Sequence, residues 1–317
     1  MRRPRFGTPR EDHYGGMLPF GTRPWPRALL TGVTSGVRTR LRGRDLALIA
    51  AGLTFYAGIA VVPLLVLAFG LTTWLTSAGR VHDLGARLAD LLPGDLGAPA
   101  AVARLVDAGV DLDPIGALLA LLPMSLYGEG LRRALMRFSA RKEGMTGWRG
   151  RLATLPLLVL APALLYPLLL VASLMADLAD RGGVAATLGQ VAVGFYAVLA
   201  ALTVPLAWGF QVVGGGRVRW PALAAGALFT AACLSGFLQG FVLFLSLPLD
   251  LGAPFGGLDV VGGVVALGLW LFLLHLVVLC GWLATESLDD LLGRRPGPAR
   301  RSGGQPVAPG PGLDHVR

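Results

Sequence analysis

The sequence has few of the residues from which hydrolytic or metal-dependent active sites are built. It contains 4 histidines and 2 cysteines in 317 residues, and both cysteines lie inside apolar runs. No two histidines have a metal-ligand spacing such as HxxxH, and no Cys/His cluster occurs. Nucleophile motifs and glycine-rich phosphate loops with a lysine are also missing. We therefore expect no catalytic residues, no metal and no cofactor, and predict that the protein is not an enzyme.

Charged residues are scarce as well. They make up 15% of the chain, whereas hydrophobic residues make up 54%, which is too apolar for a soluble domain of this length. The acidic residues on the expected cytoplasmic side are too sparse to converge on metal ions as a nuclease would need, so a ribonuclease is disfavoured. The net charge of +9 would suit a nucleic-acid partner. Its distribution follows membrane topology instead, and we expect no nucleic-acid partner.

Long apolar runs fill the middle of the chain. Five of them reach or exceed the ~20 residues that cross a bilayer core, and one is shorter. They predict an all-α integral membrane bundle (residues 46–284) of six transmembrane helices: 46–76, 112–131, 152–176, 187–213, 220–246 and 257–284.

Three further segments surround these spans. Residues 1–45 are expected to be a basic, largely disordered cytoplasmic arm with an interfacial helix near Leu29–Leu41. Residues 285–317 are expected to be a basic tail rich in proline and glycine. Between the first two spans, leucines and valines at helical spacing predict short amphipathic helices on the extracytoplasmic surface.

The basic residues predict the orientation of the bundle. Segments placed inside hold 24 lysines and arginines, and segments placed outside hold 4. This positive-inside distribution places both termini in the cytoplasm. The same distribution predicts that the short run 112–131 crosses the membrane, because without a crossing there the seven basic residues of 132–151 would lie outside.

Polar residues inside spans are candidates for function because each costs insertion energy. Glu129 is either an ionisable gate or an acid paired with Arg132 or Arg133 one turn along, and the pairing is favoured. His275 is either hydrogen-bonded to a neighbouring helix, which is favoured, or part of a proton relay. Gln239 favours a helix–helix hydrogen bond.

Proline and glycine add two expectations. Prolines interrupt several spans, which favours an irregular bundle around a cavity. Ala232, Gly236 and Gly240 predict a small-residue face that lets another helix approach closely. Candidate cavity or gate residues are Tyr56, Pro63, Glu129, His275 and Gln239, although Tyr56 could instead simply pack. Candidate contacts for anionic headgroups are Arg132, Arg133, Arg137, Arg141 and Arg149.

Two spans resemble a known family. The first, AAGLTFYAGIAVVPLLVLAFG, has an aromatic–tyrosine pair followed by Pro63, and the last, GGVVALGLWLFLLHLVVLCGWL, has the closing glycine Gly281 in register. Both resemble the YihY/BrkB family of bacterial inner-membrane proteins, formerly mislabelled ribonuclease BN. The chain departs from the family pattern in two places, where Ala60 replaces a serine and Leu283 replaces a glutamate. Glu286 lies one turn further on and is not expected to inherit that role.

The resemblance implies a role in moving lipids or envelope glycolipids across the inner membrane. We predict a transporter or flippase-like handler of a lipid or other amphipathic substrate. The alternative is a non-transporting membrane scaffold for envelope machinery. The expected partners are membrane lipids and anionic headgroups on the cytoplasmic side, and a homo-oligomer is compatible with the sequence.

Overall fold

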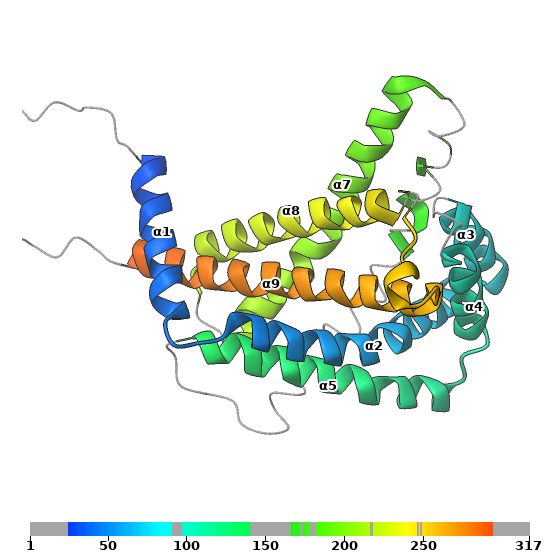
Figure 1. Cartoon of the computed structure of the whole chain (residues 1–317), viewed down its shortest axis with the longest axis horizontal. Coiled ribbons are helices and arrows are strands. Elements are labelled where there is room, and N and C mark those ends of the chain that lie inside the picture. The colour runs from blue at the N-terminus through cyan, green and yellow to red at the C-terminus, as the bar shows by residue number, and fades with distance from the viewer. Residues whose placement is uncertain are drawn as a thin grey trace, which may run out of the picture.

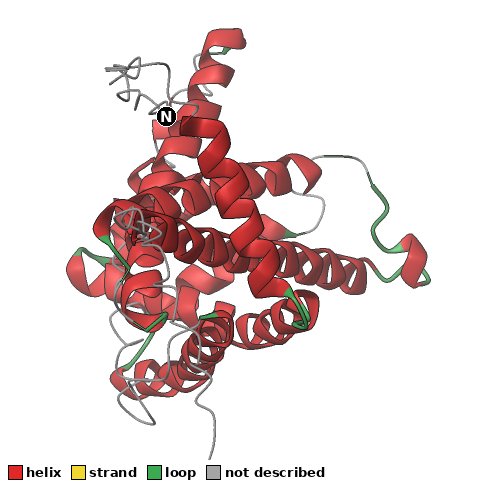
Figure 2. Cartoon of the chain, turned by 90° about the vertical axis from the view of Figure 1, so that its left-hand side faces the viewer, coloured by secondary structure: helices red, strands yellow, loops and turns green. Residues whose placement is uncertain are grey.

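A computed structural model describes residues 25–90, 97–139, 182–215, 218–245 and 249–293, together with residue 247 and scattered positions between 166 and 177. Across these ranges the secondary structure consists of helices and loops, with no strand (Figure 2). Five helices are long and apolar enough to cross a membrane. The predicted all-α membrane fold is therefore confirmed.

The five membrane-length helices agree with five of the six predicted spans. The remaining one, 152–176, lies outside the described residues apart from a few positions, so a count of six stays a prediction. The helices are α2 (Leu46–Leu75), α5 (Pro114–Phe138), α7 (Gly183–Trp208) with its π-helical continuation η1 (Gly209–Val213), α8 (Trp220–Leu245) and α9 (Asp259–Gly293). A short 3-10 turn, η2 (Ala253–Phe255), precedes α9.

Two helices continue beyond their predicted ends. α5 runs on to Phe138 and α9 to Gly293, whereas the hydropathy pattern ends these spans at 131 and 284. The added turns carry arginines in α5 and acidic residues in α9. Several of these polar side chains are buried against neighbouring helices, so hydropathy alone ends both helices too early.

The long helices run between two differently covered ends of the bundle (Figure 1). α2, α5, α8 and α9 lie along its long axis, and α7 crosses them obliquely while packing on α8. Helix α1 (Trp25–Leu41) crosses one end and packs on α9. Helices α3 (Ala78–Asp90) and α4 (Ala98–Val110) cover the other. We call these the α1 end and the α3–α4 end.

Helix α1 falls within the arm that is predicted to be largely disordered. It contains the helix expected near Leu29–Leu41, and it rests on α9 through two glycines. A Cβ atom on Gly36 would lie 2.8 Å from the side chain of Ser287, and one on Gly32 would lie 2.9 Å from Leu291. Glycine at these positions lets the two backbones approach closely. Residues 1–24 lie outside the described part of the chain.

The short helices after the first span are amphipathic, as predicted. Val81 and Leu84 on α3 and Val106 on α4 are buried together against Phe69 of α2. Their polar side chains lie on the opposite faces, which follows from the 3.6-residue period. The α3–α4 pair therefore packs on the end of α2 through one apolar cluster.

A histidine and an aspartate join the exposed sides of α3 and α4. The Nδ1 atom of His82 lies 2.9 Å from the carbonyl oxygen of Ala78, and its Nε2 atom lies 3.1 Å from Oδ1 of Asp107. Because both ring nitrogens face acceptors, only the protonated imidazolium can donate to both. The carbonyl of Ala78 and then the carboxylate of Asp107 therefore raise the pKa of His82 above its ordinary value of 6.5.

We expect Asp107→Asn to lower the pKa of His82, measured by NMR titration of the imidazole ring. Because the folded pKa is raised, the contact stabilises the α3–α4 pair below pH 6.5 and loses this effect as pH rises through the folded value. Asp90→Asn is the control, since Asp90 is not among the groups that shift His82. An unchanged titration in Asp107→Asn would contradict the assignment.

The predicted glycine face of α8 is not where the closest helix packing occurs. A Cβ on Gly236 would meet nothing within 4 Å, and one on Gly240 would make only an ordinary 3.6 Å contact with Trp270. The close approach lies elsewhere on α8, where Gly226 faces Thr285 of α9 and Thr230 faces Gly281. Small residues recur at several helical phases in this sequence, and spacing alone selected the wrong one.

Candidate functional site

A cavity of about 350 Å³ lies between α2, α5, α7, η1, α8 and α9 and is partly open at the surface. Small residues on three walls leave this space empty: Ala57 and Ala60 on α2, Gly128 on α5 and Gly209 on η1. The rest of the lining is mostly leucine, with Tyr127 and His275 as its polar side chains. A volume of this size is typical of small-ligand sites.

An irregular stretch of helix forms one wall of this cavity. Pro205 lies inside α7 and lines the cavity, and four residues later the helix passes into the π-helical turn η1. Proline lacks the N–H that continues an α-helix, and π-helical turns insert an extra residue per turn. A proline-containing helix beside a cavity agrees with the sequence-based expectation. Pro63 and Pro123 also lie inside helices, but they are not part of this lining.

His275 links three helices at the cavity wall. Its Nδ1 atom lies 2.6 Å from the carbonyl oxygen of Leu271, which is a pure acceptor, so Nδ1 carries a proton. Its Nε2 atom lies 3.2 Å from the hydroxyl of Tyr127 on α5. The Nδ1 atom is also 3.3 Å from the hydroxyl oxygen of Thr54 on α2. The favoured expectation, a hydrogen bond to a neighbouring helix, describes this geometry, and a proton relay stays a prediction.

The other cavity candidates lie away from the lining. Tyr56 packs against α5 beside Gly130, where a Cβ would lie 2.8 Å from the tyrosine ring. Gln239 donates a 2.8 Å hydrogen bond to the carbonyl of Val191 and so joins α8 to α7. Of the five residues proposed from sequence for a cavity or gate, His275 is the one that lines this cavity.

Glu129 forms an ion-pair cluster on α5. Arg132 donates through Nε and Nη2 to both carboxylate oxygens at 2.9 Å, and Arg133 donates through Nε at 2.8 Å. This is the pairing that the spacing favours, and Arg132 is nearly buried. Arg137 is exposed at the end of α5, while Arg141 and Arg149 lie outside the described residues. Headgroup binding by these arginines stays a prediction.

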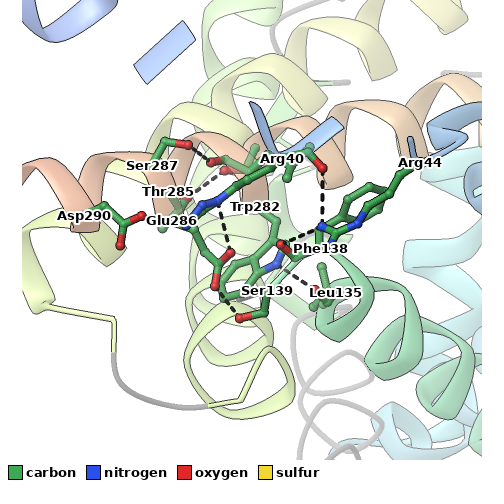
Figure 3. Close-up of polar contacts among 12 residues, drawn as sticks. Arg40, Arg44, Leu135, Phe138, Ser139, Trp282, Thr285, Glu286, Ser287 and Asp290 are labelled. Carbon is green, nitrogen blue, oxygen red and sulfur yellow. Dashed lines mark hydrogen bonds and ion pairs between the residues drawn. The ribbon is translucent and has the colours of Figure 1, made fainter. Parts of the chain in front are cut away.

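A second polar cluster at the α1 end was not anticipated from the sequence (Figure 3). Glu286 of α9 is 2% exposed, and one of its oxygens accepts a 2.6 Å hydrogen bond from the Ser139 hydroxyl at the end of α5. Its other oxygen lies 3.5 Å from Nε of Arg40 on α1. The same arginine donates through Nη2 to Asp290 at 2.8 Å. Glu286 therefore connects α1, α5 and α9.

The last carbonyls of α5 are satisfied at the same end. A helix leaves its final carbonyl groups without intrahelical donors. Trp282 of α9, which is fully buried, donates its indole N–H to the carbonyl of Leu135 at 2.9 Å. Arg44 donates to the carbonyl of Phe138 at 3.2 Å, and its positive charge suits a helix C-terminus. These contacts fix the end of α5 between α1 and α9 (Figure 3).

Asp289 of α9 supplies a hydrogen-bond acceptor at the beginning of α8. Its carboxylate accepts a 2.9 Å hydrogen bond from the backbone N–H of Arg219, the residue before α8. The guanidinium of Arg219 in turn donates to the carbonyl of Asp289 at 3.2 Å. A negative charge at a helix N-terminus is favourable, so α9 also anchors α8.

The two positions that depart from the family pattern have different surroundings. Ala60 lines the cavity, so a serine there would add a hydroxyl to its wall. Leu283 is fully buried in the apolar core beside Trp282. The acid of this region is Glu286, one turn along the same helix, and its acidic character near the end of a long apolar run was the signal that could have identified it.

Five apolar, membrane-length helices fastened at one end by a buried polar cluster define a multi-pass α-helical membrane protein. A family model described as "Virulence factor BrkB" matches residues 37–303, which is most of the chain. The protein belongs to this family, and the resemblance of its first and last spans is confirmed. No curated protein and no solved structure matches the chain.

Proposed function

We propose that this protein handles a lipid or other amphipathic substrate in the membrane, as a transporter or flippase-like protein without enzymatic chemistry. The cavity carries this proposal, because it is large enough for part of a hydrocarbon chain and is lined almost entirely by apolar side chains. A scaffold would need no such space, since well-packed interiors contain few voids larger than a water molecule.

The energetics of such a cavity suit exchange rather than tight capture. A chain that leaves the bilayer for an apolar cavity moves between two hydrocarbon environments, so the hydrophobic effect contributes little. Small packing differences then decide whether the chain stays. A substrate that enters and leaves readily is what movement through a protein requires.

The proposal includes an orientation. In a bacterial inner membrane with both termini cytoplasmic, the α1 end and the exposed arginines of α5 would face the cytoplasm. There they would attract anionic lipid headgroups. The C-terminal end of α5 and the continuation η1 of α7 both lie beside Trp282 at the α1 end, as the proposed six-span topology requires.

The test is to fill the cavity. Ala60→Trp places a large ring in the cavity, and we expect the movement of fluorescent long-chain lipids, tested as an alcohol and as a phospholipid in proteoliposomes, to fall about tenfold for any lipid that the protein moves, since a blocked path raises the barrier by about 1.4 kcal/mol or more. Leu202→Trp fills it from α7 and should act alike. Ile59→Trp is the matched control, because the neighbouring Ile59 is 44% exposed.

Two outcomes would reject the proposal. The first is a protein that moves no lipid above the level of empty liposomes. The second is equal lipid movement by Ala60→Trp, Leu202→Trp and Ile59→Trp when all three are folded. A transport rate that depends on the cavity variants alone would support it.

A further inference from the structure

The polar content of the cavity restricts what it can hold. Among the described residues that line the cavity, Tyr127 and His275 have polar side chains, and none is a carboxylate, a lysine or an arginine. A phosphate or carboxylate headgroup inside would therefore be desolvated without a counter-charge, which is costly in a low-dielectric site. The cavity suits the uncharged part of a molecule.

The hydrogen-bond pattern restricts it further. Because the Leu271 carbonyl takes the proton on Nδ1, neutral His275 has an unprotonated Nε2 atom, which accepts the hydroxyl proton of Tyr127. The nearby Thr54 hydroxyl already donates to the carbonyl of Ala50 at 2.9 Å. The hydroxyl proton of Tyr127 is donated to His275, and the lone pairs of the Tyr127 oxygen can still accept a hydrogen bond. This wall of the cavity therefore offers a hydrogen-bond acceptor, and a ligand that binds there needs a hydrogen-bond donor.

From this pattern we infer that the cavity binds a single-chain, uncharged lipid alcohol, whose hydroxyl donates to the Tyr127 oxygen while its chain contacts the leucine lining. The inference rests on the proposed function and specifies its substrate class. A volume of about 350 Å³ lies at the small end of the range for ligand sites, which suits one hydrocarbon chain. An ionised phosphate or carboxylate does not fit beside the Tyr127 oxygen, because it can only accept hydrogen bonds and the site requires a donor.

The experiment uses the full-length protein in nanodiscs and a set of photoreactive 16-carbon probes with one diazirine each. The alcohol should label peptides of the cavity wall, and unlabelled alcohol should compete. The carboxylic acid, the phosphate ester and the O-methyl ether of the same chain should each bind about fivefold to tenfold more weakly, since each lacks the donated hydrogen bond. Competition by an isoprenoid alcohol of equal length measures whether the cavity prefers a branched or a straight hydrocarbon chain.

Variants connect this preference to one atom. Tyr127→Phe should reduce the affinity for the alcohol about fivefold and leave the weak binding of the ether unchanged. Tyr196→Phe is the control, because Tyr196 is 66% exposed on α7 and does not line the cavity. Ala60→Trp should abolish labelling by every probe. The alcohol-to-ether ratio in the unmodified protein gives the same information if Tyr127→Phe does not fold.

The outcomes distinguish this inference from the proposed function. Equal binding of the acid, phosphate or ether and the alcohol would overturn the inference, as would a Tyr127→Phe protein with unchanged preference. If phospholipid movement nevertheless depended on Ala60→Trp, the proposed function would stand with a phospholipid as its substrate, and the lipid alcohol would be rejected. If neither labelling nor lipid movement responded to Ala60→Trp, both would fail.

Discussion

Glu286→Ala is expected to destabilise the protein by about 3–5 kcal/mol, the range for removing one partner of a buried ion pair. Glu286 is 2% exposed, and the substitution removes the more buried of the two carboxylates beside Arg40, which is only 14% exposed and keeps only the half-exposed Asp290. The Ser139 hydroxyl also loses its acceptor. Thermal unfolding in nanodiscs should show a Tm lower by on the order of 10 °C.

Asp290 supplies a matched control for this prediction. It binds the same arginine at 2.8 Å, but its side chain is 52% exposed. Exposed pairs contribute about 0–1 kcal/mol, so Asp290→Ala should lower the Tm only slightly. If Asp290→Ala proved as damaging as Glu286→Ala, the buried pair would not be the contact that fastens α1 to α9.

Replacing both partners separates the cost of a lone charge from the value of the pair. In Arg40→Met with Glu286→Leu, the buried ion pair is replaced by apolar side chains of similar volume, and Asp290, which loses Arg40, is 52% exposed and stays in contact with solvent. Such exchanges are often neutral or stabilising. Most of the stability lost in Glu286→Ala should therefore return, and a double variant as unstable as the single one would show that the ion pair itself holds the helices together.

Local sequence patterns predicted several of these features. Runs of about 20 apolar residues located the membrane helices, because every backbone polar group in a bilayer must be satisfied within a helix. The spacing of Glu129, Arg132 and Arg133 predicted their ion pairs, since residues three and four apart share one helix face. Both predictions rely on neighbours within a single helix.

The sequence did not reveal which residues are partners in the contacts between helices. Arg40 and Glu286 are 246 positions apart, and only the packing of α1 across the end of α9 brings them together. The partners of His275 depend in the same way on the rotation of α2 and α5. An apolar helix face carries little information about which neighbour it meets, because lipid tails and leucine side chains are equally acceptable.

The close contact between α8 and α9 gives the second large expected effect. A Cβ on Gly281 would overlap the side chain of Thr230, which is fully buried and cannot rotate into solvent. Gly281→Ala should therefore force the helices apart and destabilise the protein by about 2–3 kcal/mol, read as a lower Tm in nanodiscs. Gly268→Ala on the same helix should be neutral or slightly stabilising, because its Cβ would meet nothing within 4 Å.

A compensating substitution tests whether the overlap itself is the cause. Thr230→Gly removes the atoms that a Cβ on Gly281 would meet. Alone, it should destabilise the protein, because glycine is unfavourable within a helix and a buried side chain is lost. Combined with Gly281→Ala, it should show a favourable interaction energy in the double-mutant cycle, since the added methyl group then occupies the vacated space. Strictly additive effects would mean that Gly281 serves backbone flexibility rather than the close approach of α8 and α9.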